Sequence, residues 1–191
     1  CVIYTLYVIK YKGDALYYYQ ESLNASTAFS LGTESISFIT VFFTRVLGLS
    51  FLGTFFAYSI FGFMGLLAFD ASLRAATAGK SRNMRRFATL IVLLPSISFW
   101  SSAIGKDSLA FMATGFALWA ALNLKHRTWL MVVAILTMLL VRPHIAGIMI
   151  VALAASQLIQ RGIPMRRRLL LGGTALAASA VMVPLALNYA G

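Results

Sequence analysis

Charged residues are scarce in this chain, and acidic residues are the scarcest. Only 11% of its 191 residues are charged, while 60% are hydrophobic; in soluble domains roughly a quarter of the residues are charged. The hydrophobic residues form long runs, several of which approach the roughly 20 residues that a helix needs to cross a bilayer. This composition excludes an ordinary water-soluble domain and predicts an all-α fold, a polytopic transmembrane helix bundle.

Cysteine is nearly absent as well. Cys1 is the only one, which excludes an internal disulfide and a metal site built from cysteines. The sequence also lacks a glycine-rich phosphate loop, a nucleophile elbow and a zinc motif. The apolar run at 1–9 is too short to cross a membrane and lacks the basic start of a signal peptide. We therefore expect it to be a partial span, the end of a truncated helix.

The shortage of acids leaves a net charge of +11. In a soluble protein this excess would indicate nucleic-acid binding. Here the basic residues cluster in short loops between apolar runs, where they normally keep a loop in the cytoplasm. We therefore expect no nucleic-acid partner, and we place the loops at 70–86, 125–127 and 161–168 in the cytoplasm.

The uncharged runs between these loops define the expected topology. An outer segment at 10–48 contains a helix at 36–48 that suits the membrane interface, because it is short and carries Arg45. The chain is predicted to form a single transmembrane domain over 1–191, a fragment of a longer protein. Its full spans are expected at about 49–69, 87–105, 108–124, 128–141, 145–160 and 169–189.

Four of these spans form two short hairpins that break at the extracytoplasmic side. The rising half of the second hairpin, 128–141, covers only about 21 Å of the roughly 30 Å hydrocarbon layer. Arg142 therefore follows at a depth where a charge is costly and broken backbone must face protein or water. Pro143 supports the break, because it lacks an amide donor. The Arg-Pro-His turn is predicted to line a cavity that opens outward.

This topology gathers a small set of mixed charge on the outer face. Lysine and arginine can hold a phosphate, and a carboxylate can take a proton from an attacking hydroxyl. Aromatic rings could pack against a sugar, and serine hydroxyls could bind it. Several candidates also have a structural interpretation. Lys106 and Asp107 could lie in a solvated loop in which Asp107 caps the next helix. His144 could be a packing residue, and the tyrosines after Asp14 could form an aromatic belt at the membrane surface. The candidate catalytic residues are Asp14, Asp107 and His144; the candidate substrate-binding residues are Lys106, Arg142, Trp100, Ser101, Ser102 and Tyr17.

Three short motifs together carry a family resemblance. They are Gly-Asp-Ala at 13–15 with the tyrosines that follow, Leu-Pro-Ser-x-x-Phe-Trp-Ser-Ser-x-x-x-Lys-Asp-Ser at 94–108, and Arg-Pro-His at 142–144. The combination resembles polytopic proteins of bacterial exopolysaccharide and cell-envelope gene clusters, of the GT-C glycosyltransferase class or the related polysaccharide polymerases.

The resemblance implies a protein of the bacterial inner membrane whose donor is a polyprenyl-phosphate sugar. In GT-C enzymes an acid in the first outer loop is functional, and by that similarity Asp14 is the candidate base. Many members carry two acids close together there, whereas here the next acid is Glu21, seven residues on. A divalent metal is therefore possible but unsupported, and no other cofactor is expected.

The leading hypothesis is thus an integral membrane glycosyltransferase or polymerase-like protein acting on a lipid-linked saccharide at the extracytoplasmic face. One alternative is a transporter or flippase for a lipid-linked or anionic solute, with the broken helices forming its binding site. Another is a non-catalytic membrane subunit that positions a partner enzyme. The expected partners are the lipid bilayer, the lipid-linked saccharide and other envelope-biosynthesis proteins.

Overall fold

The computed structural model describes residues 2–24 and 31–159, together with short pieces at 165–166, 172–173, 177 and 180. In these parts the chain is helical and contains no strand, which confirms the all-α prediction. The predicted loop at 161–168 and span at 169–189 lie largely outside the described residues. The elements are α1 (Val2–Tyr11), α2 (Asp14–Leu23), α3 (Thr33–Val41), the π-helical turn η1 (Phe42–Val46), α4 (Phe51–Thr77), α5 (Arg82–Val92), α6 (Pro95–Trp100), α7 (Lys106–Ala121), α8 (Leu124–Val141) and α9 (Pro143–Ile159).

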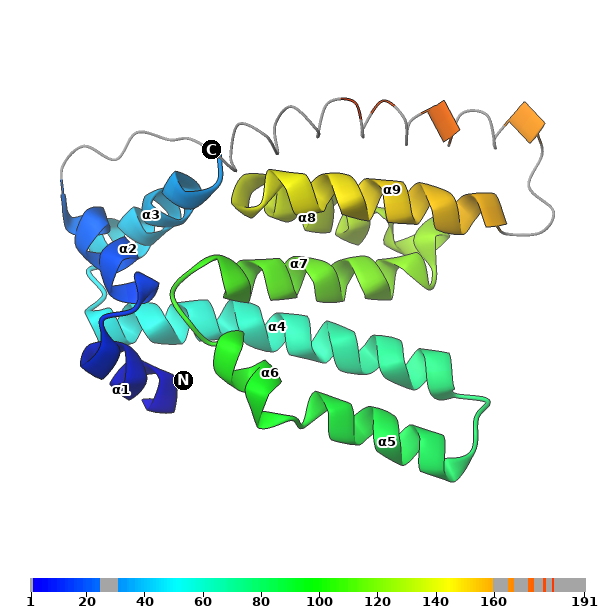
Figure 1. The fold of residues 1–191 in the computed structure, drawn as a ribbon, viewed down its shortest axis with the longest axis horizontal. Helices are drawn as coiled ribbons and strands as arrows, with labels where there is room; N and C mark the ends of the chain where they lie inside the picture. Colours follow the sequence, from blue (N-terminus) through cyan, green and yellow to red (C-terminus); the bar gives the residue numbers. More distant parts are fainter. Residues whose placement is uncertain are drawn as a thin grey trace.

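The centre of the fold is a layer of long helices. Helix α7 packs along α4 on one side and along α8 on the other, and α9 packs on α8 (Figure 1). The α4–α7 contact depends on glycine: a Cβ at Gly65 would stand 2.7 Å from the Met112 Cα, and a Cβ at Gly115 would stand 2.5 Å from the Gly65 carbonyl oxygen. Small residues allow this approach, as in helix pairs within membranes.

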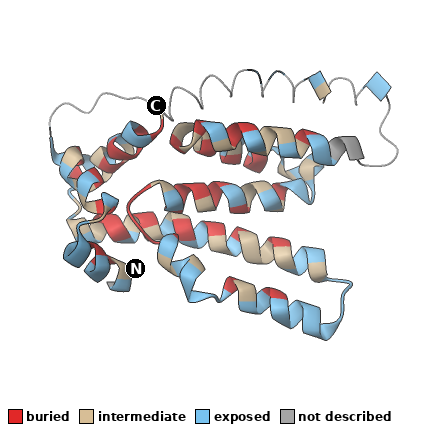
Figure 2. Ribbon diagram, viewed as in Figure 1, coloured by how far each residue is buried: buried red, intermediate tan, exposed pale blue. Residues whose placement is uncertain are grey.

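Two described helices, α4 and α8, are long and apolar enough to cross a membrane by length and composition; α9 contains a shorter apolar stretch, Pro143–Ser156. Large apolar side chains remain exposed along α4 at a spacing of three or four residues, which places them on one face. Burial is concentrated in α7 and on the sides of α4 and α8 that face it, whereas α5 is mainly exposed (Figure 2). The exposed residues on α4 are Leu52, Phe56, Ile60, Phe63, Met64 and Leu67.

The segment expected as one span at 87–105 contains two short helices instead. Helix α5 ends at Val92, and α6 begins at Pro95 after Leu94, which has the extended conformation φ −59°, ψ 124°. Proline lacks an amide donor and disfavours helical backbone in the residue before it. Pro95 therefore separates the two helices.

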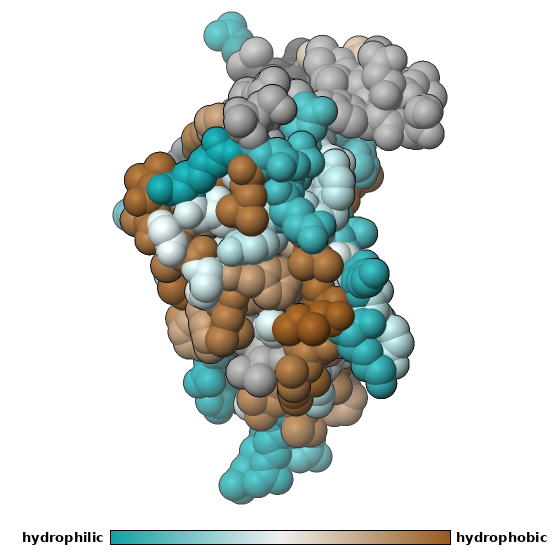
Figure 3. Space-filling model, turned by 90° about the vertical axis from the view of Figure 1, so that its left-hand side faces the viewer, coloured by the Kyte–Doolittle hydropathy of each residue, from teal (hydrophilic) through white to brown (hydrophobic). Residues whose placement is uncertain are grey.

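The first four helical elements gather at one end of the long helices (Figure 1). Their core joins Val8, Ile36 and Tyr58, all fully buried. The Tyr58 hydroxyl lies 2.9 Å from the Thr40 hydroxyl, which links α3 to α4. On this end the surface mixes hydrophilic and hydrophobic residues (Figure 3). Because α4, α7 and α9 begin at this end and α8 finishes there, it also holds both predicted hairpin turns.

Candidate functional site

The turn between α8 and α9 is held by backbone hydrogen bonds. Arg142 has the non-helical conformation φ −143°, ψ 79°, and its carbonyl accepts hydrogen bonds from the amides of residues 145 and 146. The last carbonyls of a helix need partners outside it. The Leu140 carbonyl accepts from the Gly32 amide at 2.8 Å and from the Ser35 hydroxyl at 2.8 Å. The start of α3 is therefore fixed to the end of α8.

A second turn places two charges at the start of α7. Gly105 has φ +153°, a conformation that other residues rarely adopt, so a side chain there would be strained. Lys106 and Asp107 follow in the first turn of α7. A carboxylate is favourable at this positive end of the helix dipole and an ammonium is not. The buried Ser108 hydroxyl donates to the Gly105 carbonyl at 3.1 Å and steadies the turn.

The two turns are joined by side chains. The Arg142 guanidinium forms an ion pair with the Asp107 carboxylate, which connects the start of α7 to the α8–α9 turn. The Lys106 ammonium donates to the Thr33 hydroxyl at 2.6 Å. Lys106 keeps two further donors, and the arginine keeps donors beyond its ion pair. Both cations can therefore bind an additional anion.

Helix α2 brings Asp14 to the same place. Asp14 and Tyr18 are four residues apart and so lie on one face of α2. Together with Lys106, Asp107 and Arg142 they line a cavity of about 460 Å³. Within the described part of the chain Asp14 has no ion-pair partner, whereas Asp107 is paired. Asp14 is thus the carboxylate of this polar cavity that is available to accept a proton.

Burial and charge shift two pKa values in the polar cavity. Burial, with smaller contributions from the carboxylates of Asp14 and Asp107, raises the pKa of Tyr18 to about 12. The same side chain is only 6% exposed. Burial, followed by the positive charge of Arg142, lowers the pKa of Lys106, and the two carboxylates oppose this shift. The cavity therefore holds a neutral phenol beside a lysine that is less strongly hydrated than an exposed one.

An apolar groove adjoins the polar cavity. Trp100, Asp107 and Arg142 line both the polar cavity and a second cavity of about 400 Å³, whose remaining walls are mainly apolar. Thr114 in turn lines both this second cavity and a third, of about 240 Å³, between α7, α8 and α9. The Thr114 hydroxyl donates to the carbonyl of Ala110, so it offers little polarity to the groove. We call the second and third cavities together the groove. Its lining residues on α7 run from Asp107 to Ala121, a length of about 21 Å.

Not all the predicted site residues meet at the polar cavity. Trp100 lines it and the groove, and Ser101 lines the groove only, with its hydroxyl bonded to the Ile97 carbonyl at 2.7 Å. Ser102 is buried and donates to the Phe99 carbonyl. Tyr17 and His144 are exposed and line none of these cavities.

Tyr18 of α2 and three further residues of this site are absent from the sequence-based prediction. Tyr4 and Tyr7 of α1 line the polar cavity, and Thr33 holds Lys106. The tyrosines could have been found from their spacing of three residues, which marks one helix face. Thr33 carries no such signal, because its role depends on the tertiary bond between Gly32 and Leu140.

No group of three or more His, Cys, Asp or Glu side chains that could hold a metal ion occurs among the described residues. The chain matches no protein-family model, no curated protein and no solved structure. A function for the site therefore has to be sought in the chemistry of its own residues.

Proposed function

We propose that the chain is part of a multi-pass membrane glycosyltransferase or polysaccharide polymerase that binds a lipid-linked saccharide at the extracytoplasmic face. One observation carries the proposal: a polar cavity with two cations and two carboxylates shares Trp100, Asp107 and Arg142 with an adjoining, mainly apolar groove. A polyprenyl-phosphate sugar has the matching parts, an anionic phosphate, a polar sugar and a long apolar chain. The groove would bind the apolar polyprenyl chain of the donor, and the polar cavity would bind its phosphate and sugar.

The distribution of charge and apolar surface supports the membrane setting. Helix α4 spans about 40 Å and exposes large apolar side chains along one face, which water disfavours and lipid accepts. The basic residues expected in a loop at 70–86 lie instead on the last turns of α4, the short connection after it and the start of α5, at the end of the bundle away from the polar cavity. Cytoplasmic loops carry an excess of Lys and Arg, so this arrangement favours an extracytoplasmic position for the cavity.

In the proposed reaction, different residues of the polar cavity bind the donor phosphate, orient the binding group and accept a proton. Lys106 and Arg142 bind the phosphate of the donor, and Asp107 orients the arginine through their ion pair. Asp14 accepts the proton of the acceptor hydroxyl as that oxygen attacks the sugar. A bond forms between the acceptor oxygen and the anomeric carbon, and the bond from that carbon to the phosphate oxygen breaks. The departing lipid phosphate keeps the electron pair, and the two cations stabilise its charge.

Binding and transfer test this proposal in sequence. Purified protein should bind undecaprenyl phosphate, and Lys106→Met or Arg142→Met should weaken binding by about tenfold or more, since charge-assisted hydrogen bonds contribute roughly 1.5–3 kcal/mol. Asp14→Asn should leave binding unchanged and abolish transfer of labelled sugar by membranes that contain the protein. Lys12→Gln is the matched control for loss of a positive charge. Lys12 is close to Asp14 in sequence but does not line the cavity, so this variant should bind and transfer as the wild type does.

The groove has its own test. Thr114→Trp should block the groove, so that undecaprenyl phosphate binds weakly while a short, water-soluble isoprenyl phosphate binds as before. Equal binding of the long and short lipids to wild type and variant would contradict the assigned groove.

If the protein moves the lipid across the bilayer of liposomes and forms no glycosidic bond, the flippase alternative replaces transfer. If all three variants at the polar cavity retain full activity, the site assignment is wrong.

A further inference from the structure

The far end of the bundle carries another cavity, lined by arginines and separate from the three described above. Four of them, from the end of α4 and the start of α5, surround a space of about 440 Å³. A loop needs positive charge to stay in the cytoplasm, but it does not need those charges to converge on one cavity. The convergence requires a separate explanation. The four are Arg74, Arg82, Arg85 and Arg86.

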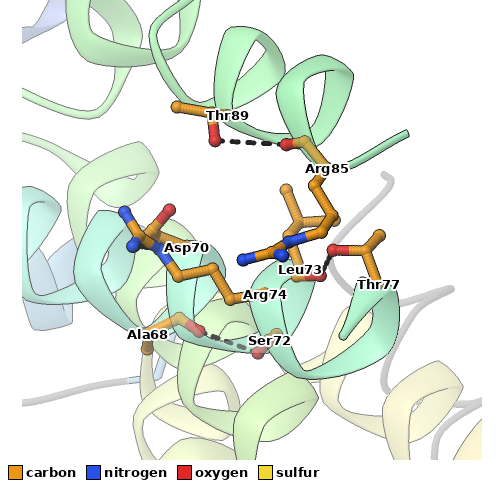
Figure 4. Close-up of polar contacts among 8 residues, drawn as sticks. All are labelled: Ala68, Asp70, Ser72, Leu73, Arg74, Thr77, Arg85 and Thr89. Carbon is orange, nitrogen blue, oxygen red and sulfur yellow. Dashed lines mark hydrogen bonds and ion pairs between the residues drawn. The ribbon is translucent and has the colours of Figure 1, made fainter. Parts of the chain in front are cut away.

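Most of this charge has no counter-charge in the described part of the chain. Arg74 forms an ion pair with Asp70 at 2.7 Å, and the Asp70 side chain is only 24% exposed. The Asp70 carboxylate therefore neutralises Arg74 and not the arginines of α5. Arg85 extends from α5 toward α4 (Figure 4). The hydroxyls of Thr77 and Thr89, which also line this cavity, both donate to backbone carbonyls and add no negative charge. The cavity therefore presents guanidinium groups to whatever enters it.

Guanidinium groups match phosphate in shape as well as charge, because their paired donors fit two phosphate oxygens. We propose that the arginine cavity binds the phosphate of an anionic phospholipid headgroup at the cytoplasmic surface of the membrane. Its volume admits a phosphate and a small alcohol group. This binding is independent of the lipid-linked substrate proposed for the polar cavity.

Helix α5 indicates that the phosphate belongs to a lipid. Helix α5 packs on α4, its Ala88 and Val92 are buried, and its arginines line the cavity. A third side of the helix exposes Met84, Phe87 and Leu90, of which Phe87 is 65% exposed. A short helix with one basic and one apolar side suits the interface, where the apolar side enters the acyl region beneath the headgroups. A soluble anion would not account for this exposed apolar side.

The test is a titration of the detergent-solubilised chain with dioctanoyl phosphatidylglycerol, followed by native mass spectrometry. The triple variant Arg82→Gln, Arg85→Gln, Arg86→Gln should bind about 100-fold more weakly, since each basic residue near an anionic surface contributes about a fivefold change. The three side chains are exposed, so the fold should persist; an unchanged helical circular dichroism spectrum checks this. The matched control removes the same number of charges from outside the cavity, at Lys10, Lys12 and Lys80.

Dioctanoyl phosphatidylcholine and inorganic phosphate distinguish the possible ligands. The proposal expects neither to bind at the concentration at which phosphatidylglycerol saturates the wild type, and expects the control variant to match the wild type. Equal loss in both triple variants would show that overall charge, and not the arginine cavity, governs binding. If inorganic phosphate binds as tightly as phosphatidylglycerol, the ligand is not a lipid. The single variant Arg85→Gln, with an expected loss of about fivefold, provides the same test if the triple variant is unstable.

Discussion

Gly62 lies on α4, away from the charged residues of the polar cavity, yet we expect Gly62→Ala to damage the site. An added Cβ would stand 1.9 Å from the Ser101 carbonyl oxygen and 2.8 Å from the carbonyl carbon of the same residue. Ordinary contact begins near 3.4 Å, so the backbone at Ser101 must move by about 1.5 Å. That backbone leads directly into Gly105, Lys106 and Asp107. The displacement therefore passes to both charges at the start of α7.

The size of the effect follows from two opposing contributions. Overpacking costs typically 1–3 kcal/mol, and a backbone clash as short as this one belongs at the upper end. Replacing glycine by alanine inside a helix returns about 1 kcal/mol. The net loss of about 2 kcal/mol should lower the Tm by about 4–8 °C for a chain of this length. Intrinsic fluorescence during heating of the detergent-solubilised protein measures it.

Gly53→Ala is the matched control, because it makes the same change on the same helix. Its Cβ would meet only side-chain atoms, the nearest being the Leu49 Cβ at 3.3 Å. This variant should keep the wild-type Tm or raise it slightly. If Gly62→Ala also keeps the wild-type Tm and binds undecaprenyl phosphate normally, the close packing of α4 on the turn before α7 does not position the site.

Two further predictions concern the outer end of the bundle. The pKa of Tyr18 is raised from 10.0 to about 12 in the folded protein, so the unfolded chain loses this proton first. The stability of the fold should therefore fall as the pH rises through this range. Tyr18→Phe should show a smaller fall in Tm between pH 10 and 12, and parallel Tm curves for variant and wild type would contradict the assigned burial. Ser35→Ala removes the hydroxyl that donates to the Leu140 carbonyl, which should cost about 1 kcal/mol and lower the Tm by about 2–4 °C. The exposed Ser98→Ala should leave the Tm unchanged, and an equal loss in both variants would contradict this role.

Sequence reasoning predicted the helical fold, which depends on local signals. It also singled out Asp14, Trp100, Lys106, Asp107 and Arg142, which lie around the polar cavity. The low charge and long apolar runs favoured helices, and the break at Pro143 directed attention to Arg142. The ion pair between Arg142 and Asp107 required two turns 35 positions apart to meet, which the hairpin pattern suggested. Helices α4 and α8 are long and apolar enough to cross a membrane, and the multi-pass arrangement stays a prediction.

Contacts that depend on tertiary geometry could not be read from the sequence. His144 adjoins Arg142 in the motif but is exposed, because the helical start of α9 directs successive side chains to different faces. Thr33 gave no signal, since a backbone bond to α8 brings it to Lys106. The basic loop near Arg85 was explained by orientation alone, and only the packing of α5 against α4 gathers its arginines around one cavity.

The hydrogen bonds at Leu140 also bear on how the polar cavity could open. That carbonyl oxygen accepts from the Gly32 amide, and it shares the single hydrogen of the Ser35 hydroxyl with the Gly32 carbonyl oxygen. Separating α3 from α8 would break both at once. The bonds from Lys106 to Thr33 and from Asp107 to Arg142, by contrast, join flexible side chains that can exchange one partner for another. A ligand can therefore replace these two side-chain bonds and enter while the backbone frame around it stays closed.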